Sequence, residues 1–395
     1  MLQVDSVTSD EAATAGAGAA TAVLTAPLSL DGGLAAELQP ANLVQRVLSL
    51  FGNVRPGSDL SHLQLPATFN LPKSQLQLYG EGVYCIGEDY LRRCANGKDS
   101  LERFAAVVGW SISTTRPPIF GFAPYNPVLG ETHHVSSGSL HVLLEQVSHR
   151  PPVSALHATD DSGDVELVWC QNPVPKFHGT SVEATVEGKR HVKLLKFSEN
   201  YEIDCPNLLI RLLPAPSVEW SGTVSIVCKD SGLEAQVCYY RSHTFLGLSG
   251  DPRCVKGKIF HSASRETICE IHGHWDRTVS LKDAQTGNVS VLYDARSAIA
   301  DLKTPVVRNQ EGLSPSESAV VWSEVSDAIL TKDWERSRQA KRLVEDTARR
   351  LDKERSDKGE VWIPKHFSLS QDKHGHWEYW PLQKSVSPAP IIVPP

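Results

Sequence analysis

The chain has 395 residues, of which 41% are hydrophobic and 22% are charged, and its formal net charge is −7 at pH 7. This composition is ordinary for a globular protein with a sizeable core, so it argues against global disorder. The negative charge argues against a protein that binds nucleic acid through overall positive charge, although a local basic patch could still meet phosphates.

The eight cysteines contain no CxxC pair and no close cluster, so neither a disulfide framework nor a zinc site can be read from their spacing. We expect reduced thiols, no metal and no cofactor. The first twenty residues contain no Lys or Arg, unlike a secretory signal or a transit peptide, and no run approaches the ~20 apolar residues of a membrane-spanning helix. The sequence therefore predicts a cytoplasmic protein that touches membranes peripherally and transiently.

Residues 1–38 are rich in Ala, Thr, Ser and Gly, which bury little apolar surface, and we expect a flexible tail there. In residues 39–54 the apolar residues recur at helical spacing, and Gly52 is expected to end the helix. This helix either packs on the core or covers a pocket and touches membrane. Its apolar face consists of Leu43, Val44, Val47, Leu48, Leu50 and Phe51.

The rest of the chain divides by pattern into three segments and a tail. Residues 55–137 predict helices and a loop, with Asp99 or Ser100 as an N-cap. Residues 138–300 contain alternating apolar and polar runs separated by tight turns, which predict antiparallel strands in a barrel or sandwich. Residues 301–370 return to helix, and the Pro-rich residues 371–395 end the chain. The fold class is thus α+β, mainly antiparallel β, with residues 39–370 forming one domain.

The stretch EQVSHRPP, residues 145–152, ends a predicted strand with His149 and Arg150. Two prolines then lock the chain in an extended conformation, so these side chains are held at a rim. Adjacent His and Arg side chains suit an anion, above all a phosphate. The alternative is that His149 caps local backbone groups while Arg150 pairs with a surface carboxylate.

The stretch GFAPYNPVLGETHH, residues 121–134, contains two X-Pro breaks and can present backbone N–H groups and Asn126 to a ligand. Taken alone, it could equally be an ordinary turn.

Both stretches resemble motifs of one family. EQVSHRPP is similar to the fingerprint EQVSHHPP of the oxysterol-binding protein related family, and YNPVLGET resembles its NPLLGET loop. The resemblance extends from about residue 41 to 367 and includes NVRPGSDL, FNLPKSQLQ, GKIF and GHWDRTV. The chain is most similar to short, plant-type members that lack a separate pleckstrin-homology domain.

The resemblance implies a near-complete β-barrel around an apolar tunnel, a lid formed by the N-terminal helix at residues 39–54, and a C-terminal helical subdomain. Such tunnels take one lipid at a time, a sterol or phosphatidylinositol 4-phosphate. By similarity, His149 and Arg150 face the 4-phosphate. Asn126, Leu129 and Gly130 meet the glycerol and inositol-phosphate region, and Glu131 supports their loop.

The C-terminal helix adds three residues to this head-group site. Lys341, Glu345 and Arg349 are spaced by four, so they share one helical face, and the family's Lys, Glu and Arg head-group residues match them. A solvated salt-bridge ladder is the alternative interpretation.

The sequence departs from the family pattern at two positions. Ala123 stands where a Lys is common, and Arg150 replaces the second His of the fingerprint. Because Arg stays charged at neutral pH whereas His titrates near ~6.5, we expect Arg150 to compensate partly for Ala123.

We therefore expect a lipid-binding and transfer protein that visits membranes, with an endoplasmic-reticulum receptor as a candidate partner and no nucleic acid. A phosphoinositide or sterol sensor without net transfer is the alternative. A hydrolase is disfavoured because GLSGD, residues 247–251, is not a GxSxG elbow and no HExxH motif is present.

Overall fold

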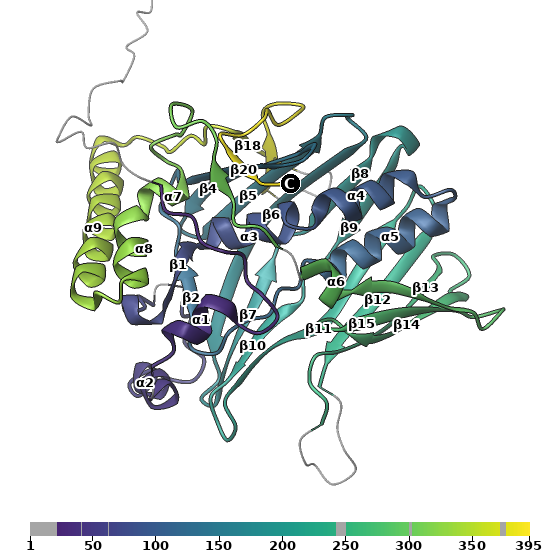
Figure 1. Cartoon of the computed structure of the whole chain (residues 1–395), viewed down its shortest axis with the longest axis horizontal. Helices are drawn as coiled ribbons and strands as arrows, with labels where there is room; N and C mark the ends of the chain where they lie inside the picture. Colours follow the sequence, from purple (N-terminus) through teal and green to yellow (C-terminus); the bar gives the residue numbers. More distant parts are fainter. Residues whose placement is uncertain (1–21, 41, 62, 242–249, 300–301, 372–376) are drawn as a thin grey trace, which may run out of the picture.

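The computed structural model describes residues 22–395 except 41, 62, 242–249, 300–301 and 372–376. A large, curled, mainly antiparallel sheet forms the body of the molecule (Figure 1). Its strands are β3 (Thr132–Ser137), β4 (Leu140–His149), β5 (Pro152–Asp160), β6 (Val165–Phe177), β7 (Ser181–Glu187), β8 (Arg190–Leu194), β9 (Glu199–Ile203), β10 (Asn207–Arg211), β11 (Ser217–Cys228), β12 (Leu233–Tyr240), β13 (Cys254–His261), β14 (Thr267–His274), β15 (Thr278–Asp283), β16 (Val289–Asp294), β17 (Val306–Val307) and β20 (Ile391–Val393).

The sheet is a near-complete barrel that forks along two long strands. The first half of β6 pairs with β8 and its second half with β7, while β11 pairs with β10 along its first half and with β9 along its end. The two branches meet again at β11. Among the described strands, β16 and β17 form the two ends of the order and do not pair with each other, which leaves the barrel open.

Three helices pack against the sheet and complete the main core: α3 (Gln75–Tyr84), α4 (Gly87–Asn96) and α5 (Ser100–Ser113). Buried side chains such as Leu76, Phe104 and Trp110 lie in one apolar cluster with strand residues such as Val142 and Val237. The predicted N-cap of α5 is confirmed, since Asp99 accepts a hydrogen bond from the backbone N–H of Glu102 at 2.8 Å. Before α3, η1 (Ala67–Phe69) leads into β1 (Asn70–Ser74), which pairs in parallel with β2 (Ala123–Tyr125).

The N-terminal helices are α1 (Gly33–Leu38) and α2 (Leu43–Leu50). Where composition predicted a flexible tail, residues 22–38 pack on the domain: the N–H of Val23 donates to the carbonyl of Ala319 at 3.0 Å, and Ala35 and Leu38 are buried. The reason is that leucines recur among the small residues of this segment. Leu24, Leu30, Leu34 and Leu38 all join hydrophobic clusters, and this burial offsets the cost of ordering.

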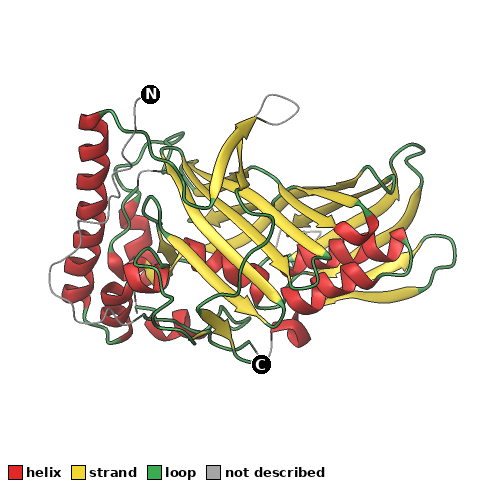
Figure 2. Cartoon of the chain, turned by 90° about the horizontal axis from the view of Figure 1, so that it is seen from above, coloured by secondary structure: helices red, strands yellow, loops and turns green. Residues whose placement is uncertain are grey.

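The C-terminal part contains α6 (Ala295–Ile299), α7 (Ser318–Val321), α8 (Ser323–Leu330) and the long α9 (Trp334–Lys358), with η2 (Leu195–Phe197) the remaining short helix. Helix α9 stands at one edge of the molecule in both views (Figures 1 and 2). No helix among the described residues combines the length and apolar character that crossing a bilayer would take.

The last segment also differs from the expected tail. β18 (Phe367–Gln371) and β19 (Trp377–Pro381) form a hairpin, and β20 pairs in parallel with β3 and antiparallel with β17. The Ile391–Val393 triplet explains this, because Ile391 is fully buried and β-branched residues favour strands.

Candidate functional site

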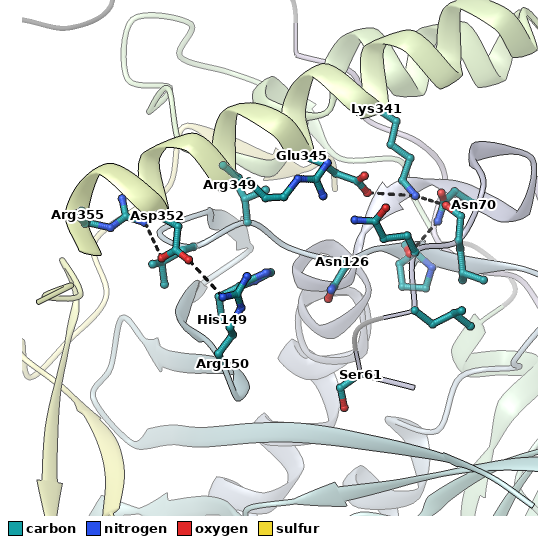
Figure 3. A pocket seen from close by; sticks show the side chains of 17 residues that line it. Ser61, Asn70, Asn126, His149, Arg150, Lys341, Glu345, Arg349, Asp352 and Arg355 are labelled. Atoms are coloured by element: carbon teal, nitrogen blue, oxygen red, sulfur yellow. Dashed lines mark hydrogen bonds and ion pairs between the residues drawn. The ribbon is translucent and has the colours of Figure 1, made fainter. Parts of the chain in front are cut away.

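One face of α9 lines a pocket of about 490 Å³ (Figure 3). The helix begins at Asp333, which accepts a hydrogen bond from the N–H of Arg336 at 3.1 Å, and ends at Gly359 in the left-handed conformation. Steps of three and four residues keep its pocket-facing side chains on one stripe. These are Lys341, Glu345, Ala348, Arg349, Asp352 and Arg355.

The facing wall comes from segments far away in sequence. The end of β4 contributes His149 and Arg150, and the loop after β2 contributes Asn126 and Leu129. Figure 3 shows His149 and Arg150 on the side opposite the α9 side chains. The remaining lining residues are Ser61, Leu63, Gln64, Leu65, Asn70, Pro124 and Val128.

Lys341 is the most enclosed cation of the pocket, with a side chain 10% exposed. Its Nζ donates to the carbonyl of Leu65 and lies 3.4 Å from Glu345 Oε1. Burial lowers the pKa of Lys341 below its ordinary value, and the Glu345 carboxylate opposes this shift. Lys341 is therefore a charge held out of water at some cost, which an anion could offset.

The other cations of the pocket are more exposed. Arg150 has a side chain 65% exposed, and its Nη1 lies 3.9 Å from Asp352 Oδ2. Arg349 Nη2 contacts Asp346 at 2.6 Å, and the Arg355 guanidinium lies 5.4 Å from the ring centre of Trp362. The lining contains four cationic side chains, those of Arg150, Lys341, Arg349 and Arg355. It contains two carboxylates, those of Glu345 and Asp352, so positive charges exceed negative ones by two.

Glu131 lies behind the pocket wall rather than in it. It is 1% exposed, and its carboxylate accepts hydrogen bonds from the Ser318 hydroxyl, the Trp322 indole N–H and the N–H of Val128 at 2.7–3.0 Å. Burial raises the pKa of Glu131, and these hydrogen bonds oppose the shift. The carboxylate thus ties the loop of Val128 to α7, which fixes the position of the pocket wall.

The structure brings most of the sequence-predicted site residues into this one pocket. Those lining it are Asn126, Leu129, His149, Arg150, Lys341, Glu345 and Arg349, whereas Gly130 and Glu131 stand behind it. The sequence interpretation missed Asp352 and Arg355, which continue the Lys341–Glu345–Arg349 stripe. Steps of three as well as four residues along the same helical face would have found them.

The predicted lid residues lie apart from the lining, on α2 and just after it. Leu43 and Val47 are buried against Phe69 and Phe177, while Val44 is 43% exposed. The other three apolar residues of that face, Leu48, Leu50 and Phe51, pack partly buried against the same cluster.

Comparison with known proteins gives the family. The model of the oxysterol-binding protein family matches residues 49–388. The chain belongs to the oxysterol-binding protein family. It is 51% identical to oxysterol-binding protein-related protein 4C of Arabidopsis thaliana, covering 94% of this chain and 98% of that protein. It is 49% identical to the related protein 4B of the same plant, covering 94% and 97%.

Solved structures of family members have the same fold. The chain matches the Osh1 ORD domain in complex with cholesterol with a TM-score of 0.73 at 22% identity, covering 85% of each chain. It matches the Osh3 ORD of Saccharomyces cerevisiae in complex with PI(4)P with a TM-score of 0.65 at 22% identity, covering 92% of this chain and 93% of that one. The predicted mainly antiparallel fold of this family is confirmed.

Proposed function

We propose that this protein is a lipid carrier whose α9 pocket binds the head group of phosphatidylinositol 4-phosphate. The observation that carries the proposal is the convergence of Lys341 and Arg349 from α9 with His149 and Arg150 from the end of β4 in one pocket. Cations from two distant elements with a net excess of positive charge suit a dianionic phosphate monoester better than a neutral ligand.

Three of these cations and Asn126 would make different contacts with the head group. Lys341 is the enclosed point charge, and a phosphate replacing Leu65 or Glu345 as its partner would relieve the cost of its burial. Arg150 and Arg349 are exposed enough to reorient, and their planar guanidinium groups can each hold two phosphate oxygens. Asn126 supplies a neutral donor and acceptor for the inositol hydroxyls.

The apolar part of the lipid needs an enclosure, because moving acyl chains through water exposes several hundred Å² of surface, about 10 kcal/mol at ~25 cal/mol per Å². We assign that enclosure to the interior of the curled sheet, with α2 as its lid. The Osh3 structure in complex with PI(4)P and the Osh1 structure in complex with cholesterol support lipid as the class of ligand. A sterol in the same enclosure is the second candidate, supported by the Osh1 complex.

Transfer between two liposome populations tests the carrier function directly. Donor liposomes contain phosphatidylinositol 4-phosphate, acceptor liposomes contain none, and both populations are assayed after separation. A carrier increases the phosphoinositide in the acceptors in proportion to protein and time. A sensor binds the donors without exchange, and a hydrolase generates a new product by mass spectrometry; either result would overturn the proposal. Lipid analysis of the material that co-purifies then decides between phosphoinositide and sterol.

A further inference from the structure

A second cluster of ligand-type side chains lies on β13, on β14 and just before β13; both strands stand far from α9 in Figure 1. Asp251, Cys254 and His274 each offer one ligand atom, and the three atoms lie within 4.8 Å of one another. The cluster shares no residue with the α9 pocket. We propose that these three residues form a zinc site, a proposal independent of the lipid function.

The backbone places Cys254 and His274 side by side. They are direct register partners on the antiparallel strands β13 and β14, so their side chains lie on the same face of the sheet. Cys254 Sγ lies 3.5 Å from His274 Nε2. In a tetrahedral zinc site, bond lengths of about 2.3 Å to sulfur and about 2.0 Å to nitrogen place these two atoms about 3.5 Å apart. The separation of the two atoms therefore already matches that of two ligands of one zinc ion.

Asp251 comes from the turn just before β13 and reaches the same histidine nitrogen. Its Oδ2 lies 2.7 Å from His274 Nε2, and its backbone carbonyl lies 3.2 Å from Cys254 Sγ. A carboxylate oxygen and an imidazole nitrogen bound to one zinc ion stand about 3.4 Å apart, so Asp251 has to move by less than 1 Å. Its side chain is 48% exposed, which permits that movement.

The convergence on Nε2 distinguishes a metal site from a catalytic triad. In a triad the nucleophile and the carboxylate contact opposite nitrogens of the histidine, so that the ring can relay a proton between them. Here the sulfur and the carboxylate both approach Nε2. That is the arrangement in which a cation replaces the Nε2 proton and draws three donors together.

Two further features hold the cluster in place. Arg277 Nη2 binds the other oxygen of Asp251, Oδ1, at 3.0 Å, which leaves Oδ2 directed at the histidine. Outer hydrogen bonds of this kind orient metal ligands. Arg253, between Asp251 and Cys254, has a positive φ of 65°, and its guanidinium is held by Asp276 Oδ2 at 2.9 Å. A strained, non-glycine residue of this kind is found where surrounding structure fixes a site.

The donor set selects the ion. Sulfur and imidazole ligands favour zinc over magnesium or calcium, which require oxygen ligands. Cys254 is 6% exposed and Asp251 half exposed, so the cluster opens to solvent on one side, where water can complete the coordination. Bound zinc would join the turn before β13 to the β13–β14 pair and so stiffen that end of the sheet.

Zinc titration of the full-length, tag-free protein tests the proposal. Zn²⁺ competes against a chromophoric chelator, and Co²⁺ serves as a spectroscopic probe, since thiolate ligation produces a near-ultraviolet charge-transfer band. The parent should bind one Zn²⁺ and show the band with Co²⁺. Changes outside the ligand set can cost about 10–100-fold in metal affinity, so Cys254→Ser, His274→Asn and Asp251→Asn should each weaken binding by at least about tenfold.

The control variants are matched by residue type. His272→Asn changes an exposed histidine on the same strand, and Cys238→Ser changes a thiol on the neighbouring strand; neither should alter zinc affinity. Zinc should raise the unfolding temperature of the parent and these controls but not of the ligand variants. Asp251→Asn lies in a solvent-exposed turn, so it keeps the test valid if the buried variants unfold. Absence of zinc binding by the parent, or equal binding by Asp251→Asn and the parent, would overturn the proposal.

Discussion

Gly130 and Trp362 lie in direct contact behind the α9 pocket: a methyl group on Gly130 would stand 2.6 Å from the Trp362 ring. Gly130 also has a φ of +79°, a conformation that other residues rarely adopt. The same tryptophan packs under Arg355, which lines the pocket. Gly130 is thus connected to the pocket lining through the Trp362 ring.

Gly130→Ala should destabilise the protein and weaken phosphoinositide binding together. The positive φ alone costs about 1–3 kcal/mol for a non-glycine residue, and displacement of Trp362 adds to that and moves Arg355. Gly163→Ala is the matched control, because Gly163 has a φ of +70° but nothing within 4 Å of the added methyl group.

Chemical denaturation and liposome binding measure the two effects. Both variants should lose the backbone contribution to the free energy of unfolding, but Gly130→Ala should lose more and should alone bind the phosphoinositide less tightly. Equal losses in stability and unchanged binding for both would show that the contact between Gly130 and Trp362 has no role in the site.

Lys341→Met should separate binding from stability. The folded pKa of Lys341 lies below its unfolded value, so at neutral pH the unfolded chain holds this proton more tightly and burial of the charge costs stability. Replacement by Met should leave the free energy of unfolding at pH 7 unchanged or higher, while phosphoinositide affinity falls by tenfold or more. The stability difference between Met and Lys should shrink as the pH rises above about 10.4, the ordinary Lys pKa, because Lys341 then loses its proton in the unfolded as well as the folded state.

Lys353→Met on the exposed part of α9 is the control for this prediction. It removes the same charge from the same helix outside the pocket and should change neither quantity. Equal losses of affinity in the two variants would mean that α9 attracts the membrane by its general charge and that Lys341 has no specific contact.

Arg150→His should make phosphoinositide binding depend on pH. At pH 8 the imidazole is neutral and affinity should fall by about 3- to 10-fold. This is less than a buried charged hydrogen bond contributes, because the Arg150 side chain is 65% exposed. At pH 6 the imidazole gains a proton and much of the affinity should return. The ratio of parent to variant affinity, measured at both pH values, cancels the titration of the phosphate itself.

Arg350→His provides the comparison on the far side of α9, where Arg350 is paired with Glu354 at 2.7 Å outside the pocket. Its affinity ratio should stay near one at both pH values. If the ratio of parent to Arg150→His affinity does not change with pH, the charge of Arg150 does not contribute to phosphoinositide binding. The hypothesis that Arg150 compensates for Ala123 would then be wrong.

The fold could be anticipated from the sequence because its signals are local. The alternation of apolar and polar residues in 138–300 involves only near neighbours in sequence, and the structure has strands there. The spacing of Lys341, Glu345 and Arg349 is equally local, and these residues lie on a helix. Two short motifs with family resemblance then indicated which distant segments meet. The 3.9 Å separation between Arg150 and Asp352 depends on how α9 packs against the sheet. No local sequence pattern predicts that packing.

The ends of the chain could not be predicted for a related reason. The average composition of residues 1–38 is dominated by small residues and does not show that a few leucines pack on the domain. In the same way, the Pro-rich composition of the C-terminal end does not show that Ile391 is buried beside β3. The contact between Gly130 and Trp362 could not be predicted from the sequence either, since more than two hundred positions separate them. Burial of a few side chains decided each case, and burial is a property of the assembled fold.

Val47→Ala should loosen the proposed lid. Val47 is 5% exposed in the cluster that holds α2, and removing two methyl groups at about 0.8 kcal/mol each weakens its docking by about 1.6 kcal/mol. That is an increase of about 15-fold in the open population, so bound lipid should dissociate faster from the protein in solution. Val44→Ala is the control: it removes the same two groups from the same helix, but Val44 is 43% exposed, and its variant should release lipid at the parent rate. Release is followed as the decay of a fluorescent lipid signal after dilution into lipid-free acceptor liposomes. Equal rates for the two variants would mean that α2 is a fixed part of the core, and the lid assignment would fail.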